Sequence, residues 1–319
     1  MKTSDAVLVV GSIAFDDLEM PSGSFKDVVG GAATYSSLAA SLLAPVRLVG
    51  IVGEDFPEAQ LVTLRERGID TQGVERVAGG KTFRWHGRYA DDLLSRTSLD
   101  TQLNVFADFQ PKLPATYAST PFVLLGNIHP KLQLDVVKQV RSAATPKLIA
   151  ADTMNFWIAG EPGALGELLK KIDLLVINEE EARELSGIHN ITRAAADIRR
   201  RGPQSGMALI IKRGEYGALV FDDAGVFFTP GYPLEDVYDP TGAGDTFAGG
   251  LLGYMARLGD ASPASLRRAT FFASALASFC VEDIGTKRLG KVTHMELAAR
   301  IEAFAKLVDY GGNLALSEA

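Results

Sequence analysis

The chain has 319 residues, of which 47% are hydrophobic and 22% charged, and it carries a formal net charge of −7. This composition is typical of a globular protein, at a length that suits one large α/β domain with an appendage, or two domains. The negative charge gives no electrostatic footprint for nucleic acid, and a single cysteine, Cys280, excludes an internal disulfide framework and fits a reducing compartment.

The chain runs from Met1 directly into an apolar strand, without the architecture of a signal peptide. Its longest nearly apolar run, Ala269 to Val281, is shorter than the ~20 residues of a membrane span. We therefore expect a soluble, cytoplasmic protein with no membrane or nucleic-acid partner. The last residues, Asn313 to Ala319, are expected to be disordered.

Short apolar runs, typical of buried parallel strands, alternate with helical patterns along the chain. The apolar runs are Ala6 to Val10, Val46 to Val52, Phe122 to Leu125, Leu148 to Ala150, Leu174 to Ile177 and Ala208 to Ile211. The helical patterns are Tyr35 to Leu43, Ala59 to Arg67, Leu132 to Ala143, Leu165 to Lys170 and Thr192 to Arg200. This alternation predicts a mostly parallel sheet covered by helices on both faces.

Polar residues follow each of these strands, where ligands bind in an open α/β sheet. They are Gly11-Ser12, Gly53-Glu54-Asp55, Gly126-Asn127, Asp152-Thr153, Asn178-Glu179 and Lys212-Arg213-Gly214. Any one group by itself is more typical of a helix cap or a turn, but six together favour a site.

Two segments interrupt the alternation, Ser12 to Val29 and Gly79 to Asn104. Both lack helical periodicity, and Thr82 to Tyr89 has the alternating character of an exposed strand. On pattern alone the simplest interpretation is an ordinary surface hairpin.

Asp239-Pro-Thr-Gly-Ala-Gly-Asp-Thr-Phe-Ala-Gly-Gly250 is the most informative stretch. A β-like run precedes it, at Gly225 to Phe228 and on to Val237, and a helical pattern begins near Gly244 or Asp245. A Gly-rich turn that opens a helix directs free N–H groups and the positive end of the helix dipole at an anion, here most simply a phosphate.

Asp245 is the unusual residue of this turn, because a carboxylate repels a neighbouring anion. It either accepts a proton from an attacking hydroxyl during phosphoryl transfer or simply caps the helix. Two other glycine loops are excluded. A dinucleotide fingerprint needs glycine where Phe247 stands, and the only Gly-Lys-Thr, at Gly80, has Glu75 where a Walker loop needs its first glycine.

The stretch from Asp239 to Phe247 resembles the C-terminal signature of the ribokinase-like (PfkB) family of carbohydrate and nucleoside kinases. The resemblance implies a three-layer α/β/α fold with a small β-sheet lid, formed by about 12–34 and 80–106, in a single domain over 1–319. It implies Asp245 as catalytic base and the amides of Gly242, Ala243 and Gly244 as anion hole.

On the acceptor side, Asp16 matches the family aspartate that grips substrate hydroxyls, and Gly30-Gly31 resembles the first family signature. Asn127, Asn155 and Trp157 are further candidates for the acceptor pocket. The chain departs from the ribokinase pattern, because Ala14, Ala32 and Tyr35 stand where ribokinase-type enzymes carry Asn, Lys and Asn. Ribokinase activity itself is therefore in doubt.

On the donor side, Asn178 and Glu181 resemble the Asn-x-x-Glu element that organises Mg²⁺, here through water. The resemblance also places ATP against several other residues. These are Lys212, Gly214, Gly217, Thr241 and Gly285. In some family members the position of Asp239 lies near a monovalent-cation site, which adds K⁺ to the expected cofactors ATP and Mg²⁺.

We therefore expect an ATP-dependent kinase that phosphorylates a hydroxyl of a small sugar or sugar derivative, with a homodimer through the lid by family analogy. A nucleoside kinase of the same fold is the main alternative. A non-catalytic sugar- or nucleotide-binding protein is another, although a binder has no need of the base Asp245. An NAD-dependent enzyme is the weakest, because the dinucleotide fingerprint is absent.

Overall fold

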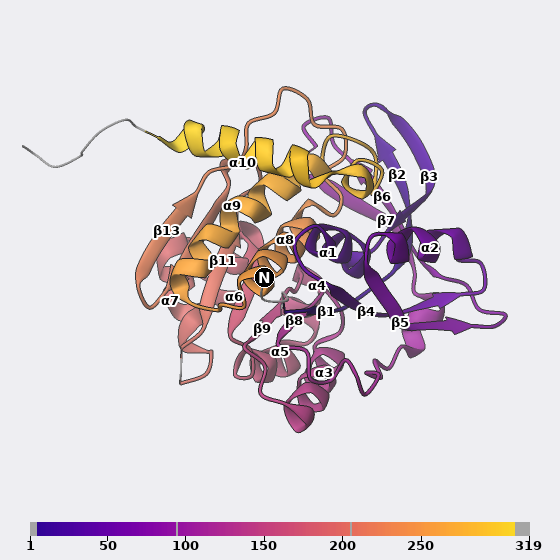
Figure 1. Ribbon diagram of the computed structural model, residues 1–319, viewed down its shortest axis with the longest axis horizontal. Helices are drawn as coiled ribbons and strands as arrows, with labels where there is room; N and C mark the ends of the chain where they lie inside the picture. Colours follow the sequence, from indigo (N-terminus) through magenta and orange to yellow (C-terminus); the bar gives the residue numbers. More distant parts are fainter. Residues whose placement is uncertain (1–4, 94, 205, 310–319) are drawn as a thin grey trace, which may run out of the picture.

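The structure is a computed structural model that describes residues 5–93, 95–204 and 206–309 (Figure 1). The tail from 313 to 319, for which disorder was predicted, lies outside the described residues.

A central sheet of nine strands has the order β13-β12-β11-β10-β9-β8-β1-β4-β5. The strands are β1 (Val7–Val10), β4 (Val46–Gly53), β5 (Ile69–Val77), β8 (Phe122–Leu125), β9 (Leu148–Ala151), β10 (Leu174–Asn178), β11 (Ala208–Lys212), β12 (Ala218–Asp222) and β13 (Gly225–Thr229). All neighbours from β11 to β5 pair in parallel, and the two antiparallel pairings, β11 with β12 and β12 with β13, lie at one edge.

The six predicted strands are confirmed, and β5 and β12 were not foreseen. The prediction that a β-like run continues from Gly225 to Val237 was wrong beyond Thr229, where β13 ends. Pro230 and Pro233 follow at once, and proline has no N–H to donate to a ladder.

Helices cover both faces of the sheet, and the side chains of β1 point alternately into the two cores. One core contains Val7 and Val9 and the other Leu8 and Val10. The first face carries α1 (Ala32–Ser41), α2 (Glu58–Glu66), α8 (Ala243–Leu258), α9 (Pro263–Cys280) and α10 (His294–Val308). The second carries α3 (Pro130–Ala143), α4 (Asn155–Gly160), α5 (Pro162–Leu169), α6 (Glu179–Ser186) and α7 (Ile191–Arg200). The predicted three-layer α/β/α fold is confirmed.

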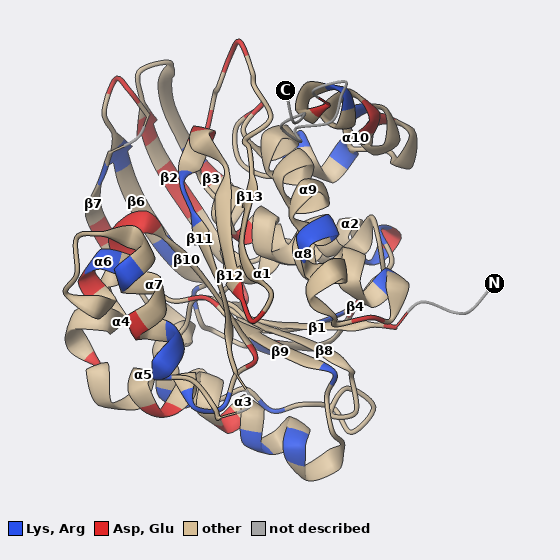
Figure 2. Ribbon diagram, turned by 90° about the vertical axis from the view of Figure 1, so that its left-hand side faces the viewer, with Lys and Arg blue, Asp and Glu red and all other residues tan. Residues whose placement is uncertain are grey.

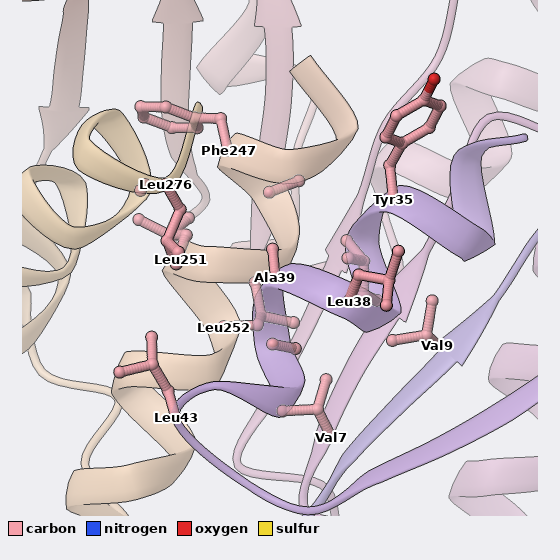
Figure 3. Close-up of a cluster of buried hydrophobic side chains, with 14 of the residues drawn as sticks. Val7, Val9, Tyr35, Leu38, Ala39, Leu43, Phe247, Leu251, Leu252 and Leu276 are labelled. Atoms are coloured by element: carbon pink, nitrogen blue, oxygen red, sulfur yellow. The ribbon is translucent and has the colours of Figure 1, made fainter. Parts of the chain in front are cut away.

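Helices α1 and α8 pack closely because small residues face each other. A Cβ added to Gly249 would lie 2.1 Å from the carbonyl oxygen of Ser36, and one added to Gly253 would lie 2.9 Å from the Cα of Ala40. Figure 3 shows Leu252 of α8 beside Ala39 of α1, and Leu251 of α8 beside Leu276 of α9, in this core. The close approach fixes the first turn of α8, which carries Asp245, against α1.

A second, four-stranded sheet has the order β3-β2-β6-β7 and stands beside the main body (Figure 2). Its strands are β2 (Ala14–Met20), β3 (Gly23–Gly30), β6 (Phe83–Tyr89) and β7 (Arg96–Gln102). They fall within the two segments predicted to form the lid, whereas residues 32–34 open α1 and 104–106 open the 3₁₀ turn Asn104–Asp108. The assignment of the whole chain to one domain stays a prediction.

The lid is held to the body by a small apolar cluster. Leu18, Met20 and Tyr89 of the lid are buried together with Ile284, which follows α9. Among the helices of the described residues, none combines the length and apolar character needed to cross a membrane.

Candidate active site

The first turn of α8 presents backbone N–H groups toward the carboxyl ends of the sheet strands. Gly242 precedes the helix with φ 76°, a left-handed conformation that favours glycine, and a Cβ there would lie 2.4 Å from the ring of Tyr35. The first α-helical hydrogen bond runs from the N–H of Thr246 to the carbonyl of Gly242 at 2.8 Å. The N–H groups of Gly244 and Asp245 lie ahead of that bond, while that of Ala243 reaches the Pro240 carbonyl at 3.2 Å.

Asp245 lies half-buried in this turn, and the hydroxyl of Ser36 donates to its backbone carbonyl at 2.9 Å. Burial and the negative charge of Asp152 raise the pKa of its carboxyl to about 7, although Lys212 and Arg96 oppose the rise. A carboxyl with a pKa near neutral, beside free amides, is suited to accept a proton.

Three neighbouring strand ends face this turn. Asp152 follows β9, Asn178 ends β10, and Lys212 ends β11 directly beside Asn178 in the sheet register. The Nζ of Lys212 lies 3.3 Å from a carboxylate oxygen of Asp152 and would lie 2.9 Å from a Cβ added to Gly244. Lys212 therefore places a positive charge next to the predicted anion hole.

Lys212 stays charged at this position. Burial alone would lower the pKa of its ammonium group, but the charges of Asp152, Glu181 and Asp245 outweigh burial and raise it.

Asn178 and Glu181 cap helix α6 reciprocally. The side chain of Asn178 accepts from the Glu181 N–H at 2.8 Å, and that of Glu181 accepts from the Asn178 N–H at 2.7 Å. Burial and the charge of Asp152 raise the pKa of the Glu181 carboxyl to about 7. Over the described residues, no three His, Cys, Asp or Glu side chains are grouped so that they could hold a metal ion by themselves.

Asp16 is buried on the acceptor side of the same region. A Cβ on Gly30 would lie 2.0 Å from one of its carboxylate oxygens, and a Cβ on Gly31, where φ is 92°, would lie 2.5 Å from the Ser12 carbonyl oxygen. Burial and the charges of Asp239 and Asp245 raise the pKa of Asp16 to about 8. The two glycines therefore let the chain turn closely around Asp16.

Asp239 ties the loop after α9 to the anion-hole turn. One of its carboxylate oxygens accepts from the Thr241 N–H at 2.8 Å and the other from the Gly285 N–H at 2.7 Å. Burial raises the pKa of Asp239, against the effect of these hydrogen bonds. Gly285, with φ 61°, lies beneath Val28 of the lid, whose Cγ1 would be 2.2 Å from an added Cβ.

The two predicted glycines of the donor turn differ in their surroundings. A Cβ on Gly217, where φ is 89°, would lie 2.1 Å from the Thr229 carbonyl oxygen, so this glycine is required by backbone packing. Gly214, with φ 56°, has no such neighbour within 4 Å and leaves open space beside Lys212 and Arg213.

Asn127 and Asn155 are occupied by protein partners. The side chain of Asn127 accepts from the indole N–H of Trp157 at 3.0 Å and lies 3.0 Å from the sulfur of Met154. The side chain of Asn155 hydrogen-bonds to Glu184 of α6 and thus faces that helix. Asp16 lies close enough to Asp245 for their charges to interact. The side chains of Asn127 and Asn155, by contrast, already hydrogen-bond to other side chains of the protein.

Three residues near the site were not predicted as members of it. The sequence marks Tyr35 only as a departure from the ribokinase pattern, and its buried hydroxyl has no hydrogen-bond partner among the described residues. Tyr89 of the lid shares a 2.8 Å hydrogen bond with the hydroxyl of Thr241. Arg96 stands opposite Tyr89 in the register, and its charge partly offsets the rise, due mainly to burial, in the pKa values of Asp16 and Asp245.

Asp152 is a fourth residue of the site that was not predicted as a member of it. Unlike the other three, it is visible in the sequence as one of the polar residues that follow the strands. For Arg96 no local pattern exists, because its role depends on how the lid folds over the body.

A comparison of the chain with models of protein families identifies the family to which this site belongs. The model described as pfkB family carbohydrate kinase matches residues 2–291. The chain belongs to this family. The resemblance drawn from the Asp239 to Phe247 motif is thereby confirmed, and so is the expected activity, that of an ATP-dependent carbohydrate kinase.

Individual relatives of this pfkB-family protein are kinases of sugars and nucleosides. Cytidine kinase of Thermococcus kodakarensis is 29% identical over 258 residues, which cover 79% of this chain and 88% of that protein. A nucleoside kinase of Burkholderia thailandensis, solved with inosine, superposes with a TM-score of 0.77 at 20% identity, over 93% of this chain and 98% of the other.

A third relative was solved with a nucleotide. A putative ribokinase II of E. coli, in complex with ATP and Mg²⁺, superposes with a TM-score of 0.76 at 22% identity, over 94% of this chain and 99% of that one. At these identities the two structures establish the shared fold of the pfkB-family protein.

Proposed function

We propose that this pfkB-family kinase transfers the γ-phosphoryl group of ATP to a hydroxyl of a small sugar or sugar derivative, with Asp245 as general base. The observation that carries the proposal is the place of Asp245, in the first turn of α8 beside free amides, with a carboxyl pKa raised to about 7 by burial and by Asp152. A simple helix cap needs no such pKa.

In this mechanism the acceptor is held by Asp16 and by the backbone at Gly30 and Gly31. The hydroxyl proton passes to the Asp245 carboxylate as the hydroxyl oxygen forms a bond to the γ-phosphorus and the bond to the ADP oxygen breaks. The N–H groups of Gly242, Ala243 and Gly244 stabilise the negative charge of the transferring group. For Ala243 this requires its 3.2 Å hydrogen bond to Pro240 to give way.

The donor ATP lies against the ends of β10 and β11 in this proposal. Asn178, Lys212 and Gly214 line the path of its phosphates, and the Lys212 ammonium, 3.3 Å from Asp152, compensates their charge. Gly217 shapes the turn that follows. Thr241 and Gly285, whose N–H groups both donate to the Asp239 carboxylate, form the border of the site on the nucleotide side.

The residues present fit Mg²⁺ that is bound mainly through water and phosphate oxygens. Glu181 and Asp152 supply carboxylates at this end of the sheet, and Mg²⁺ needs few protein ligands. When bound, the ion would neutralise phosphate charge. The complex of the E. coli relative with ATP and Mg²⁺ supports both cofactors.

In addition to ATP and Mg²⁺, we propose that a monovalent cation binds near Asp239. The buried carboxylate already accepts two backbone N–H groups, so it would act mainly by holding the Gly285 loop in shape around K⁺. Turnover that is the same in K⁺ and Na⁺ at equal ionic strength would remove this proposal.

A nucleoside is the second candidate acceptor. Cytidine kinase is among the relatives, and Ala14, Ala32 and Tyr35 replace the contacts of ribokinase-type enzymes. A nucleoside presents the same sugar hydroxyls to Asp16 and differs by its base. Rates with nucleosides and with free sugars therefore separate the two candidates.

The decisive experiment measures ATP consumption with Mg²⁺ against sugars, sugar acids, sugar phosphates and nucleosides. For Asp245→Asn we expect the rate with the best acceptor to fall by about 10²–10⁴, because the general base is lost. ATP affinity and melting temperature should stay close to wild type.

The matched control is Asp135→Asn, the same change at an exposed residue of α3 that pairs with Lys138. It should leave turnover unchanged. Retained activity in Asp245→Asn would refute the base, and binding of an acceptor without turnover in the wild type would favour a non-catalytic binding protein.

A further inference from the structure

A cavity of about 600 Å³ lies on the flank of the molecule, and neither Asp245 nor Asp16 lines it. Strand β3 of the lid forms one wall, and α1, α2 and the loop of residues 284–291 form the others. Its size falls within the range of small-molecule sites, about 300–1,000 Å³. None of the residues assigned above to the acceptor, the donor or the base lines it.

The rim of this flank cavity is positively charged. Lys26 of β3 and Lys287 and Lys291 of the loop all line it, and all three are exposed. Within the described ranges none of these lysines forms an ion pair. The one acidic residue of the lining, Asp27, is already paired with Arg84 at 2.6 Å. In a chain of net charge −7, three unpaired ammonium groups around one cavity favour an anionic ligand.

The floor of the flank cavity is apolar. Val28, Leu38, Leu64 and Ile284 contribute hydrophobic side chains, each buried or partly buried. Thr34 also lines the cavity, and its buried hydroxyl has no hydrogen-bond partner in the part of the chain that the structure describes. A charged rim over an apolar floor fits a ligand with an anionic group and a compact organic body.

We propose that the flank cavity binds a small phosphorylated metabolite as an effector, separate from substrate and ATP. Lysine ammonium groups bind phosphate well as point charges. Because Lys26 belongs to the lid and Lys287 and Lys291 to the body, one bound phosphate ester joins the two parts and holds the lid against the body.

The structure contains a path from the flank cavity to the active site. Val28 packs over Gly285, whose N–H is bound by Asp239, and Asp239 also holds the N–H of Thr241 before the anion hole. A ligand that fixes β3 against the loop therefore lowers the KM of the acceptor. This kinetic effect rests on the proposed function, whereas binding to the cavity does not.

The test is isothermal titration calorimetry with pyrophosphate and with glucose 6-phosphate, in the presence of a saturating non-hydrolysable ATP analogue and Mg²⁺. The variant replaces Lys26, Lys287 and Lys291 by Gln. The control replaces Lys112, Lys138 and Lys306 by Gln, which changes the net charge equally at exposed positions away from the cavity. Melting curves verify that both variants fold.

We expect glucose 6-phosphate to bind the wild type and the control alike, and to bind the cavity variant at least about tenfold more weakly. Tighter binding of glucose 6-phosphate than of pyrophosphate shows that the organic body of the ligand adds contacts beyond those of the phosphate. No binding to the wild type, or equal affinity in the cavity variant, overturns the proposal. A failure of Asp245→Asn to lose activity leaves this result unaffected, so the two proposals fail separately.

Discussion

Tyr35 is the residue whose buried polar group most needs an explanation. Its ring fills the space beneath Gly242, while its hydroxyl is buried without a hydrogen-bond partner among the described residues. Burial, reinforced by the charge of Asp16, raises its pKa well above the usual range, so the hydroxyl remains neutral. An unsatisfied buried hydroxyl costs free energy until a ligand or water meets it.

For Tyr35→Phe we therefore expect a melting temperature equal to or above that of the wild type, together with a KM for the acceptor raised about tenfold. The matched control is Tyr117→Phe, because the Tyr117 hydroxyl does donate to the Asp70 carbonyl at 3.2 Å. That variant should lose about 1 kcal/mol of stability and keep its KM. A destabilised Tyr35→Phe with normal KM would contradict the interpretation.

The raised pKa of Asp245 predicts the pH dependence of the reaction. The base acts only when ionised, so kcat/KM should rise with pH and level off above a pKa near 7, falling about tenfold per unit well below it.

Asp152→Asn removes the second cause of that shift, after burial, and frees Lys212 to act more strongly on Asp245. The profile should then move to lower pH by about one unit. An unchanged profile in this variant would show that the observed pKa belongs to another group.

At the scale of elements, the packing of α1 on α8 places the catalytic turn. Gly249→Ala would put a Cβ 2.1 Å from the carbonyl oxygen of Ser36, the residue whose hydroxyl donates to the Asp245 carbonyl. We expect a loss of about 1–3 kcal/mol in the free energy of unfolding, because the helices must separate. Turnover should fall as well, since the shift is transmitted to Asp245.

Gly166→Ala in α5 is the matched control for this change. No heavy atom lies within 4 Å of the added Cβ, so the better helix propensity of alanine should stabilise the protein by roughly 0.5–1 kcal/mol. Urea unfolding of both variants measures the difference, and equal stability of the two would refute the packing argument.

At the scale of the whole molecule, the lid leaves two strand edges, β3 and β7. All seven residues of β7 are exposed, among them Leu99, and an open edge can pair with a second copy of the chain. We propose a homodimer through the lid. Light scattering after size exclusion should give twice the chain mass of 34.1 kDa.

Leu99→Lys is the variant that tests this dimer, because a charge on the edge opposes pairing, and it should shift the protein toward the monomer. Ser142→Lys, at an exposed position of α3, is the control. A monomer in the wild type at micromolar concentration would end the proposal.

The sequence by itself indicated the two lid segments through its resemblance to a known family, and its local patterns determined the parallel sheet, most of its helices and the turn that carries Asp245. These features are local: continuous apolar runs indicate buried strands, a 3.6-residue period indicates a helix, and Gly242 and Gly244 mark a turn that only glycine-rich sequence forms easily. Strand β5 was not predicted because it is an edge strand with an irregular burial pattern and therefore has no continuous apolar run.

Only the tertiary structure decided which residues meet around that turn. Tyr35 beneath Gly242, Tyr89 on Thr241 and Lys212 beside Asp152 are separated by at least 60 positions in the chain, and no local pattern relates them. The same holds for the lysines of the flank cavity. A residue's own neighbours in sequence fix its backbone, but the charges and hydroxyls that face its side chain, and hence its pKa and chemistry, depend on how distant elements pack.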